Sequence, residues 1–270
     1  MTQFYTASPS EILARYVKRY WAMDHAGHAG DETAQRIVPS GLTELVFYFG
    51  TPPGISGGHH HFEDSVLLSG QQTDPYDLNV SGALSLFSVY FRPEGVRAFF
   101  DIPCDELADR HFPLRFLLKN ETGELEGRLY DAATFRERVD LIESFLIGRL
   151  KRMDNHYVLK RLSQSVSLIG EYNGQVGVDR LAAEACLSRK QYERSFMHHL
   201  GISPKQFSRT VRFQYALAQK GMHPTMSLTS LAHDCGYYDQ SHMIREFRAL
   251  SGFTPSEFFS EGVPYSDFYQ

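Results

Sequence analysis

The pattern of apolar and polar residues changes its period roughly 110 residues into the chain. Before that point the apolar residues gather in short runs of strand-forming residues, with Gly, Asn, Asp and Ser between them. These runs are residues 43–49, 62–68, 76–80 and 84–91. Several short strands separated by turn residues predict a small β-sandwich or barrel. We expect two exceptions, a short helix at residues 10–21 and a loop at the Pro- and Gly-rich residues 51–58.

After residue 107 the apolar residues recur every three or four positions, which is the period of an amphipathic helix. One such stretch starts at Leu114 and breaks near residues 120–123, and another is predicted at residues 156–172. The clearest stripe lies within residues 134–153 and consists of Phe135, Val139, Ile142, Phe145, Leu146 and Leu150. This stripe either packs on the core of its own domain or takes part in a dimer interface, and only the first role is needed to explain it.

Two segments of the C-terminal part of the chain repeat one another. Arg194 and Arg245, Phe196 and Phe247, Gly201 and Gly252, and Pro204 and Pro255 each lie 51 residues apart. In each copy a short helix and a turn lead to a second helix that starts with a capping residue, Ser188 or Asp239. We therefore predict two helix-turn-helix units joined by a single helix at residues 204–220. A helical array without a ligand fits less well, because such arrays usually need at least about three copies.

The second copy contains Ala232-x-x-Cys235-Gly236-Tyr237, then Gln240-Ser241-His242-Met243-x-Arg245-x-Phe247, then Gly252-Phe253-Thr254-Pro255-x-x-Phe258. Together with the first copy, this pattern covers residues 178–259 and resembles the DNA-binding domain of the AraC/XylS family of bacterial transcription regulators. The resemblance implies seven helices, with two recognition helices that enter successive major-groove segments on one face of double-stranded DNA. It also implies a transcription regulator, such as an activator, that contacts RNA polymerase.

By position, the resemblance assigns one set of residues to bases and another to phosphates. The base-facing residues are Lys190, Glu193 and Arg194 in the first unit and Gln240, Ser241, Ile244 and Arg245 in the second. The phosphate-facing residues are Ser188, Arg189 and His242. The chemistry fits, because Arg pairs with guanine, Gln with adenine and Glu with cytosine, while Ile touches the thymine methyl group. Glu193 is nevertheless an acidic residue beside DNA, and a salt bridge within the domain is the alternative role for Arg194 and Arg245.

The N-terminal half resembles, less specifically, the β-rich and in some cases cupin-like sensor domains of one AraC-family subgroup. The resemblance rests on Val38-Pro39-Ser40-Gly41 and on Val89-x-Phe91-Arg92-Pro93-Glu94-Gly95, among other short matches. The predicted fold class is therefore α+β, with a β-rich sensor domain and its C-terminal helices in residues 1–153 and an all-α DNA-binding domain in residues 154–270. An effector pocket is predicted at Trp21, Tyr48, Phe87 and Tyr90, although these aromatic residues could equally fill the barrel.

Composition and charge add little to the prediction of the protein's class and location. The chain has 270 residues, of which 42% are hydrophobic and 22% charged, as is ordinary for a globular protein. Its three cysteines show no paired spacing, and it has neither a signal-peptide pattern nor a long apolar run, so we expect a cytoplasmic protein away from membranes. Two of the three cysteines, Cys186 and Cys235, are predicted to be buried in the first helices of the two helix-turn-helix units. Residues 1–155 carry 15 Lys and Arg against 22 Asp and Glu, and residues 156–270 carry 12 against 10.

A run of three histidines, His59 to His61, is the one hint of enzyme chemistry. Consecutive residues of a strand point to alternate faces, so these three cannot all bind one metal ion, and a solvated turn is expected. No catalytic residue, metal or cofactor is predicted. The alternatives are a metal-dependent cupin-type enzyme domain fused to a DNA-binding domain, and a sensor of a protein partner instead of a small-molecule effector. A homodimer is a further possibility that the sequence leaves open.

Overall fold

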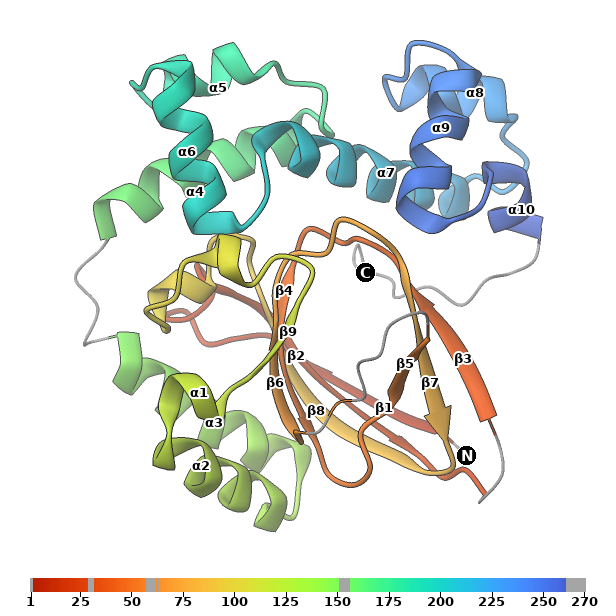
Figure 1. Cartoon of the computed structure of the whole chain (residues 1–270). Coiled ribbons are helices and arrows are strands. Elements are labelled where there is room, and N and C mark those ends of the chain that lie inside the picture. The colour runs from red at the N-terminus through yellow and green to blue at the C-terminus, as the bar shows by residue number, and fades with distance from the viewer. Residues whose placement is uncertain (1, 29–31, 57–61, 63, 151–155, 261–270) are drawn as a thin grey trace.

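The computed structural model describes residues 2–28, 32–56, 62, 64–150 and 156–260. Its N-terminal domain is built on two β-sheets, and its C-terminal domain is entirely helical and lies across one end of the sheets (Figure 1). Both features confirm the predicted fold class. The predicted domain boundary at residue 153 falls outside the described residues and stays a prediction.

The two sheets of the N-terminal domain face each other across the interior of the domain (Figure 1). The larger sheet has the order β1 (Thr2–Ala7), β2 (Val17–His25), β8 (Leu84–Phe91), β4 (Thr43–Tyr48), β6 (Val66–Ser69) and β9 (His111–Pro113). The smaller sheet has the order β3 (Glu32–Ile37), β7 (Tyr76–Ser81) and β5 (Gly54–Ser56). Every pair of neighbouring strands is antiparallel. Because side chains alternate along a strand, the larger sheet presents one face to the smaller sheet and the other to helices.

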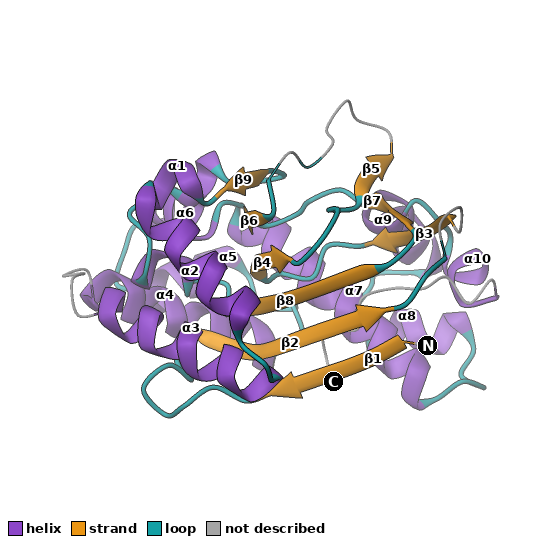
Figure 2. Ribbon diagram, turned by 90° about the horizontal axis from the view of Figure 1, so that it is seen from below, coloured by secondary structure: helices purple, strands orange, loops and turns teal. Residues whose placement is uncertain are grey.

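Three helices cover the outer face of the larger sheet, and Figure 2 shows them beside its strands. They are α1 (Arg115–Leu118), α2 (Asn120–Asp131) and α3 (Phe135–Leu150), and two short 3-10 helices, η1 (Val96–Ala98) and η2 (Cys104–Glu106), precede them. Val139, Ile142 and Leu146 of α3 are buried in the same core as Phe47 and Phe87 of the sheet. The apolar stripe therefore packs on the core of its own domain.

Several predicted elements of this domain are wrong or misplaced. Residues 11–16 form turns and the strand β2 follows, so no helix spans residues 10–21. The strand is favoured because its backbone forms hydrogen bonds with β1 on one side and β8 on the other, and these outweigh the tendency of the local apolar spacing to form a helix. The break near residues 120–123 is also wrong, since α2 runs through them and the chain turns instead at Lys119, where φ is 49°. The expected loop contains the short strand β5, and the strand expected at residues 62–68 begins only at Val66.

The C-terminal domain contains seven helices between residues 156 and 260, as the resemblance implies. They are α4 (His156–Glu171), α5 (Val178–Glu184), α6 (Arg189–Leu200), α7 (Pro204–Met222), α8 (Leu228–Asp234), α9 (Gln240–Ser251) and α10 (Pro255–Ser260). The long helix α7 contributes Phe207 to the core of the first unit and Phe213 to that of the second. It is therefore a shared spine under two separately packed units. In the described part of the chain, no helix has the length and apolar character needed to cross a membrane.

Candidate functional site

The helices α6 and α9 start and end in the same way. The Ser188 hydroxyl accepts a hydrogen bond from the Gln191 backbone N–H, and the Gln191 side chain accepts one from the Ser188 N–H at 3.1 Å, which is a complete capping box. At the start of α9 the Asp239 carboxylate accepts the His242 N–H at 2.6 Å. Gly201 and Gly252 end the two helices with φ of 88° and 81°. The predicted caps are thus confirmed in both units.

The turn before each of these helices holds a residue with positive φ, Cys186 at 52° and Gly236 at 72°. Cys186 is exposed, so its predicted burial is wrong, whereas Cys235 is buried as expected. The reason lies in the alignment of the two units: Leu181 and Leu231 are 50 residues apart, and the same offset places Cys186 opposite Gly236. Cys186 is therefore an L-residue in a backbone conformation that favours glycine.

The predicted base-facing residues share the outer faces of α6 and α9. The inner face of α6 buries Tyr192, Phe196 and Leu200, and that of α9 buries Met243, Phe247 and Leu250. On the outer faces Lys190, Arg194, Gln240, Ser241 and Arg245 are exposed, while Glu193 and Ile244 are partly exposed. Lys190, Glu193 and Arg194 precede Ser241, Ile244 and Arg245 by the repeat distance, so the two faces correspond position by position.

The alternative role proposed for Arg194 and Arg245 finds no support, because within the described residues neither guanidinium makes an ion pair. The buried ion-pair network involves Glu246 instead, which sequence reasoning missed. Its carboxylate accepts hydrogen bonds from Arg209 Nε at 3.1 Å and from Arg212 Nη2 at 2.7 Å. Both arginines belong to α7 and lie three residues apart, on one helix face, so the network fastens α9 to the spine.

The three predicted phosphate-facing residues differ in how tightly the structure holds them. Ser188 is occupied by the cap. Arg189 is exposed and pairs with Glu193 at 3.1 Å and Asp179 at 3.3 Å, two surface ion pairs that are weak enough to exchange for a phosphate. His242 is more firmly placed, because its Nδ1 accepts the Tyr238 N–H at 3.3 Å and its Nε2 lies 3.4 Å from Glu246.

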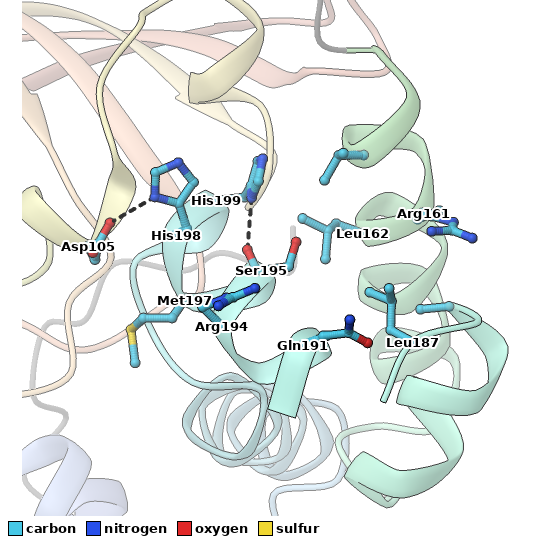
Figure 3. A pocket seen from close by; sticks show the side chains of 12 residues that line it. Asp105, Arg161, Leu162, Leu187, Gln191, Arg194, Ser195, Met197, His198 and His199 are labelled. Carbon is cyan, nitrogen blue, oxygen red and sulfur yellow. Dashed lines mark hydrogen bonds and ion pairs between the residues drawn. The ribbon is translucent and has the colours of Figure 1, made fainter. Parts of the chain in front are cut away.

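Helix α6 also borders a cavity of about 620 Å³ between α4, α6 and η2 (Figure 3). Leu162 and Leu187 line it, and Arg194 stands at its edge. At its other end His198 Nδ1 lies 3.6 Å from the carboxylate of Asp105 in η2. A single helix therefore carries both the outer polar face of the first unit and a contact with the N-terminal domain.

The N-terminal domain touches the last turn of both α6 and α9. Gly201, at the end of α6, packs so tightly on η2 that an added Cβ would lie 2.6 Å from the Cys104 carbonyl oxygen. At the end of α9, Arg36 of β3 donates a hydrogen bond to the Ser251 carbonyl at 2.9 Å and lies 5.1 Å from the Phe253 ring centroid. Both recognition-helix candidates are thus anchored, at their C-terminal ends, on the domain that holds the sheets.

The predicted effector residues do not all come together. Trp21, Tyr48 and Tyr90 lie on the face of the larger sheet that looks toward the smaller sheet, with Trp21 and Tyr90 stacked at 5.7 Å. Phe87 lies on the opposite face, fully buried beneath the helices, so its assignment to the pocket is wrong. The inner face holds instead a residue that the prediction omitted, Glu44, whose position within an apolar strand run was the available signal.

The histidine run His59–His61 lies outside the described residues. Among the residues that the structure describes, no three His, Cys, Asp or Glu side chains are placed to hold one metal ion.

Two parts of the chain match known domain families. Residues 5–113 match a domain of unknown function, DUF6597, and residues 181–261 match a helix-turn-helix domain family. The HTH-type transcriptional regulator ArgR of Pseudomonas aeruginosa is 30% identical over 155 residues, which are 57% of this chain and 46% of that protein. This chain spans less than half the length of the curated relatives it matches.

Solved structures match this chain at lower sequence identity. An AraC-type transcriptional regulator from Chromobacterium violaceum is 25% identical, with 38% of this chain and 91% of that chain covered and a TM-score of 0.35. ToxT from Vibrio cholerae, bound to an unsaturated fatty acid, is 11% identical, with 96% of this chain and 94% of that chain covered and a TM-score of 0.47. With two capped helix-turn-helix units on one spine helix, and a family match over the same residues, residues 181–261 form a helix-turn-helix domain of the AraC type.

Proposed function

We propose that this chain is a sequence-specific regulator of transcription that binds double-stranded DNA through α6 and α9. The observation that carries the proposal is the correspondence of the two outer faces, which place Lys190, Glu193 and Arg194 in the first unit opposite Ser241, Ile244 and Arg245 in the second. An α-helix fits the major groove, and each of these side chains has a base-edge partner. Gln240 adds an amide for adenine at the start of α9.

Two units on one rigid spine predict a binding site with two parts. Recognition helices that enter successive major-groove segments on one face of B-DNA contact bases about one helical turn, roughly 10 base pairs, apart. Since the two outer faces differ in sequence, the two halves of the site differ as well. A single chain therefore reads an asymmetric sequence.

The N-terminal domain is proposed to sense a signal and to pass it to both units. Its support is the pair of anchors, η2 against the end of α6 and Arg36 against the end of α9. A ligand that moves the smaller sheet relative to η2 would change how the two units are presented to DNA. Contact with RNA polymerase and activation remain predictions of the family resemblance, and a homodimer remains the alternative that the sequence leaves open.

Selection of bound DNA from a random library tests this function with the full chain. We expect an enriched site with two unlike halves whose centres are about one helical turn apart. Alanine at Arg245 should erase the preference in one half only, and alanine at Lys190 or Arg194 in the other. Recovery of unselected DNA, or of a single short half-site that both sets of variants affect equally, would refute the assignment of α6 and α9.

A further inference from the structure

The inner face of the larger sheet carries a carboxylate surrounded by aromatic rings. Strand register brings these groups together, because Glu44 of β4 lies opposite Tyr90 of β8, and Trp21 of β2 lies opposite Ser88 of β8. Glu44 Oε1 accepts a hydrogen bond from Trp21 Nε1 at 3.2 Å and another from the Ser88 hydroxyl. The Trp21 and Tyr90 rings stack beside it with an interplanar angle of 23°.

Glu44 and Trp21 are less completely enclosed than the residues on the other face of the same strands. On the outer face of the same strands Tyr20, Leu45 and Phe87 have no exposed surface at all. On the inner face Trp21 and Glu44 remain partly exposed, although the smaller sheet stands opposite them. A cavity of about 830 Å³, lined among others by Phe62, Leu67 and Tyr76, borders the inner face at Leu67 of β6, beside the cluster around Glu44. The Phe62 ring stacks on Tyr48 at 6.0 Å, which connects the cavity to the aromatic cluster.

Glu44 is poorly compensated for a carboxylate in such a place. Burial raises its pKa to about 7, against the smaller opposing effects of hydrogen bonds from Ser88, Trp21 and Tyr90 and, last, of the charge on Arg19. The Arg19 guanidinium carbon lies 5.4 Å from the Tyr90 ring centroid. A buried carboxylate is costly unless a cation and hydrogen bonds offset the loss of water. Neutral donors supply the hydrogen bonds here, the charge on Arg19 has the smallest of the compensating effects, and a cation from outside would add to it.

We propose that the interior between the two sheets binds an organic cation, an ammonium group on an apolar or aromatic body, with Glu44 as its counter-charge and the faces of Trp21, Tyr48 and Tyr90 around it. Such faces attract cations through the quadrupole of the ring. An anion would be repelled by ionised Glu44, and a neutral ligand would gain nothing from its charge. The proposal rests on the sensing role proposed above and names the class of ligand that is sensed.

The site is connected to the second DNA-binding unit through one strand pair. Tyr76 of β7, whose pKa burial and the nearby Glu44 charge raise above its usual range, pairs with Ile37 of β3. The next pair in this register is Arg36 with Asp77, and Arg36 holds the end of α9. A ligand that contacts Tyr76 therefore acts one residue away from the anchor of α9.

Binding of the cation should depend on pH with a defined sign. A cation favours the ionised form of Glu44, so affinity rises as the pH rises from about 6 to about 8. Burial raises the pKa of Tyr48, Tyr76 and Tyr90 above the usual value of tyrosine, so these phenols stay neutral in this range. The ring of His111 in β9 also lies near this region, 5.1 Å from the Tyr76 ring, so the pH dependence of Glu44→Gln is measured beside that of the parent.

The chain offers a built-in reporter, because Trp21 is its single tryptophan. The full-length protein is titrated with benzyltrimethylammonium, with benzyl alcohol as the neutral analogue and benzoate as the anionic one, while tryptophan fluorescence is recorded. We expect a saturable change with the cation, binding at least about tenfold tighter than that of the two analogues, and a further gain at pH 8 over pH 6. Glu44→Gln should weaken cation binding at least about tenfold.

Glu143→Gln is the matched control. Glu143 is also a partly buried carboxylate with two donors, the Tyr20 hydroxyl at 3.1 Å and the Ser10 N–H at 2.7 Å, but it lies on the outer side of the sheet. Its variant should bind the cation as the parent does.

Absence of a saturable cation response, equal binding of either analogue, or full binding by Glu44→Gln overturns the proposal. The comparison of charges on the unmodified protein decides the matter even if a variant fails to fold. Loss of the two-part DNA site with cation binding intact would refute the DNA function and leave the ligand site standing.

Discussion

Two adjacent residues of α9, Arg245 and Glu246, should give opposite results when each is replaced by alanine. Glu246 is only 5% exposed and holds Arg209 and Arg212 of α7, whose side chains are 29% and 14% exposed. Removing one partner of a buried ion pair costs about 3–5 kcal/mol, because the remaining charge loses its compensation. Arg209 is exposed enough to turn into water, so we take the lower end, about 3 kcal/mol, for Glu246→Ala.

Hydrogen exchange read by mass spectrometry measures this effect locally. A loss of about 3 kcal/mol corresponds to a roughly hundredfold faster exchange of the α9 amides, if they exchange through opening of the second unit. Exchange in α6 should change much less, because the first unit has its own core. Position 195, the counterpart of Glu246 in the first unit, is a serine, so no equivalent ion pair exists there to be lost.

Arg245→Ala is the matched control for this experiment. Its side chain is exposed and makes no ion pair within the described residues, so the stability of α9 should stay within about 0.5 kcal/mol of the parent. The same change should weaken binding to the selected DNA site by about 1–3 kcal/mol and relax preference at one base pair. Unchanged α9 exchange in Glu246→Ala, or equal destabilisation by both variants, would show that the network does not fasten α9.

Three further changes test other parts of the structure. Arg36→Ala removes the hydrogen bond to Ser251, worth about 1 kcal/mol, so amide exchange at residues 248–254 should rise severalfold while exchange in β8 stays unchanged. Because the pKa of Glu44 rises from about 4.5 to about 7 on folding, its contribution to stability is present below pH 4.5 and lost as the pH rises through 7. Glu44→Gln should therefore match the parent in urea denaturation at pH 4.5 and exceed it by on the order of 2–3 kcal/mol at pH 8; a constant difference would contradict this. Cys186→Gly should raise the free energy of unfolding, measured by urea denaturation, by up to about 1 kcal/mol, because φ is positive there as at Gly236.

Features that depend on a few neighbouring residues were predictable from the sequence. Each helix end depends on residues within one helical turn, namely the caps Ser188 and Asp239 and the closing glycines Gly201 and Gly252. Because the same signals occur in both copies of the repeat, each copy supports the prediction made from the other. The strand β2 was not predictable in this way, because its conformation depends on pairing with β8, whose residues lie 59 to 74 positions away in sequence. Local spacing alone indicated a helix over its first residues.

The contacts that join the domains show the same limit more strongly. Arg36 and Ser251 are 215 residues apart, and Gln214 donates to the Pro39 carbonyl across 175 residues. Nothing in the neighbourhood of Arg36 distinguishes an anchoring arginine from a solvated one. Glu44 is an intermediate case, since a carboxylate in an apolar strand run is visible in the sequence, but its aromatic partners come from three strands and become apparent only through the register.

Charge distribution limits how this protein can attract DNA. Residues 156–270 carry 12 basic against 10 acidic side chains, and two of the basic ones, Arg209 and Arg212, share the single negative charge of Glu246. The attraction to DNA phosphates, which usually dominates the affinity of a DNA-binding protein, is therefore weak. Directional contacts from the outer faces of α6 and α9 must supply a larger share of the binding free energy. The N-terminal part, with 15 basic against 22 acidic residues, lies at the C-terminal ends of both helices, where Asp105 faces His198. That side repels DNA, whereas the helix N-termini at Ser188 and Asp239 carry the positive ends of the helix dipoles. Fold and charge thus favour the same approach, with DNA lying across the N-terminal ends of α6 and α9.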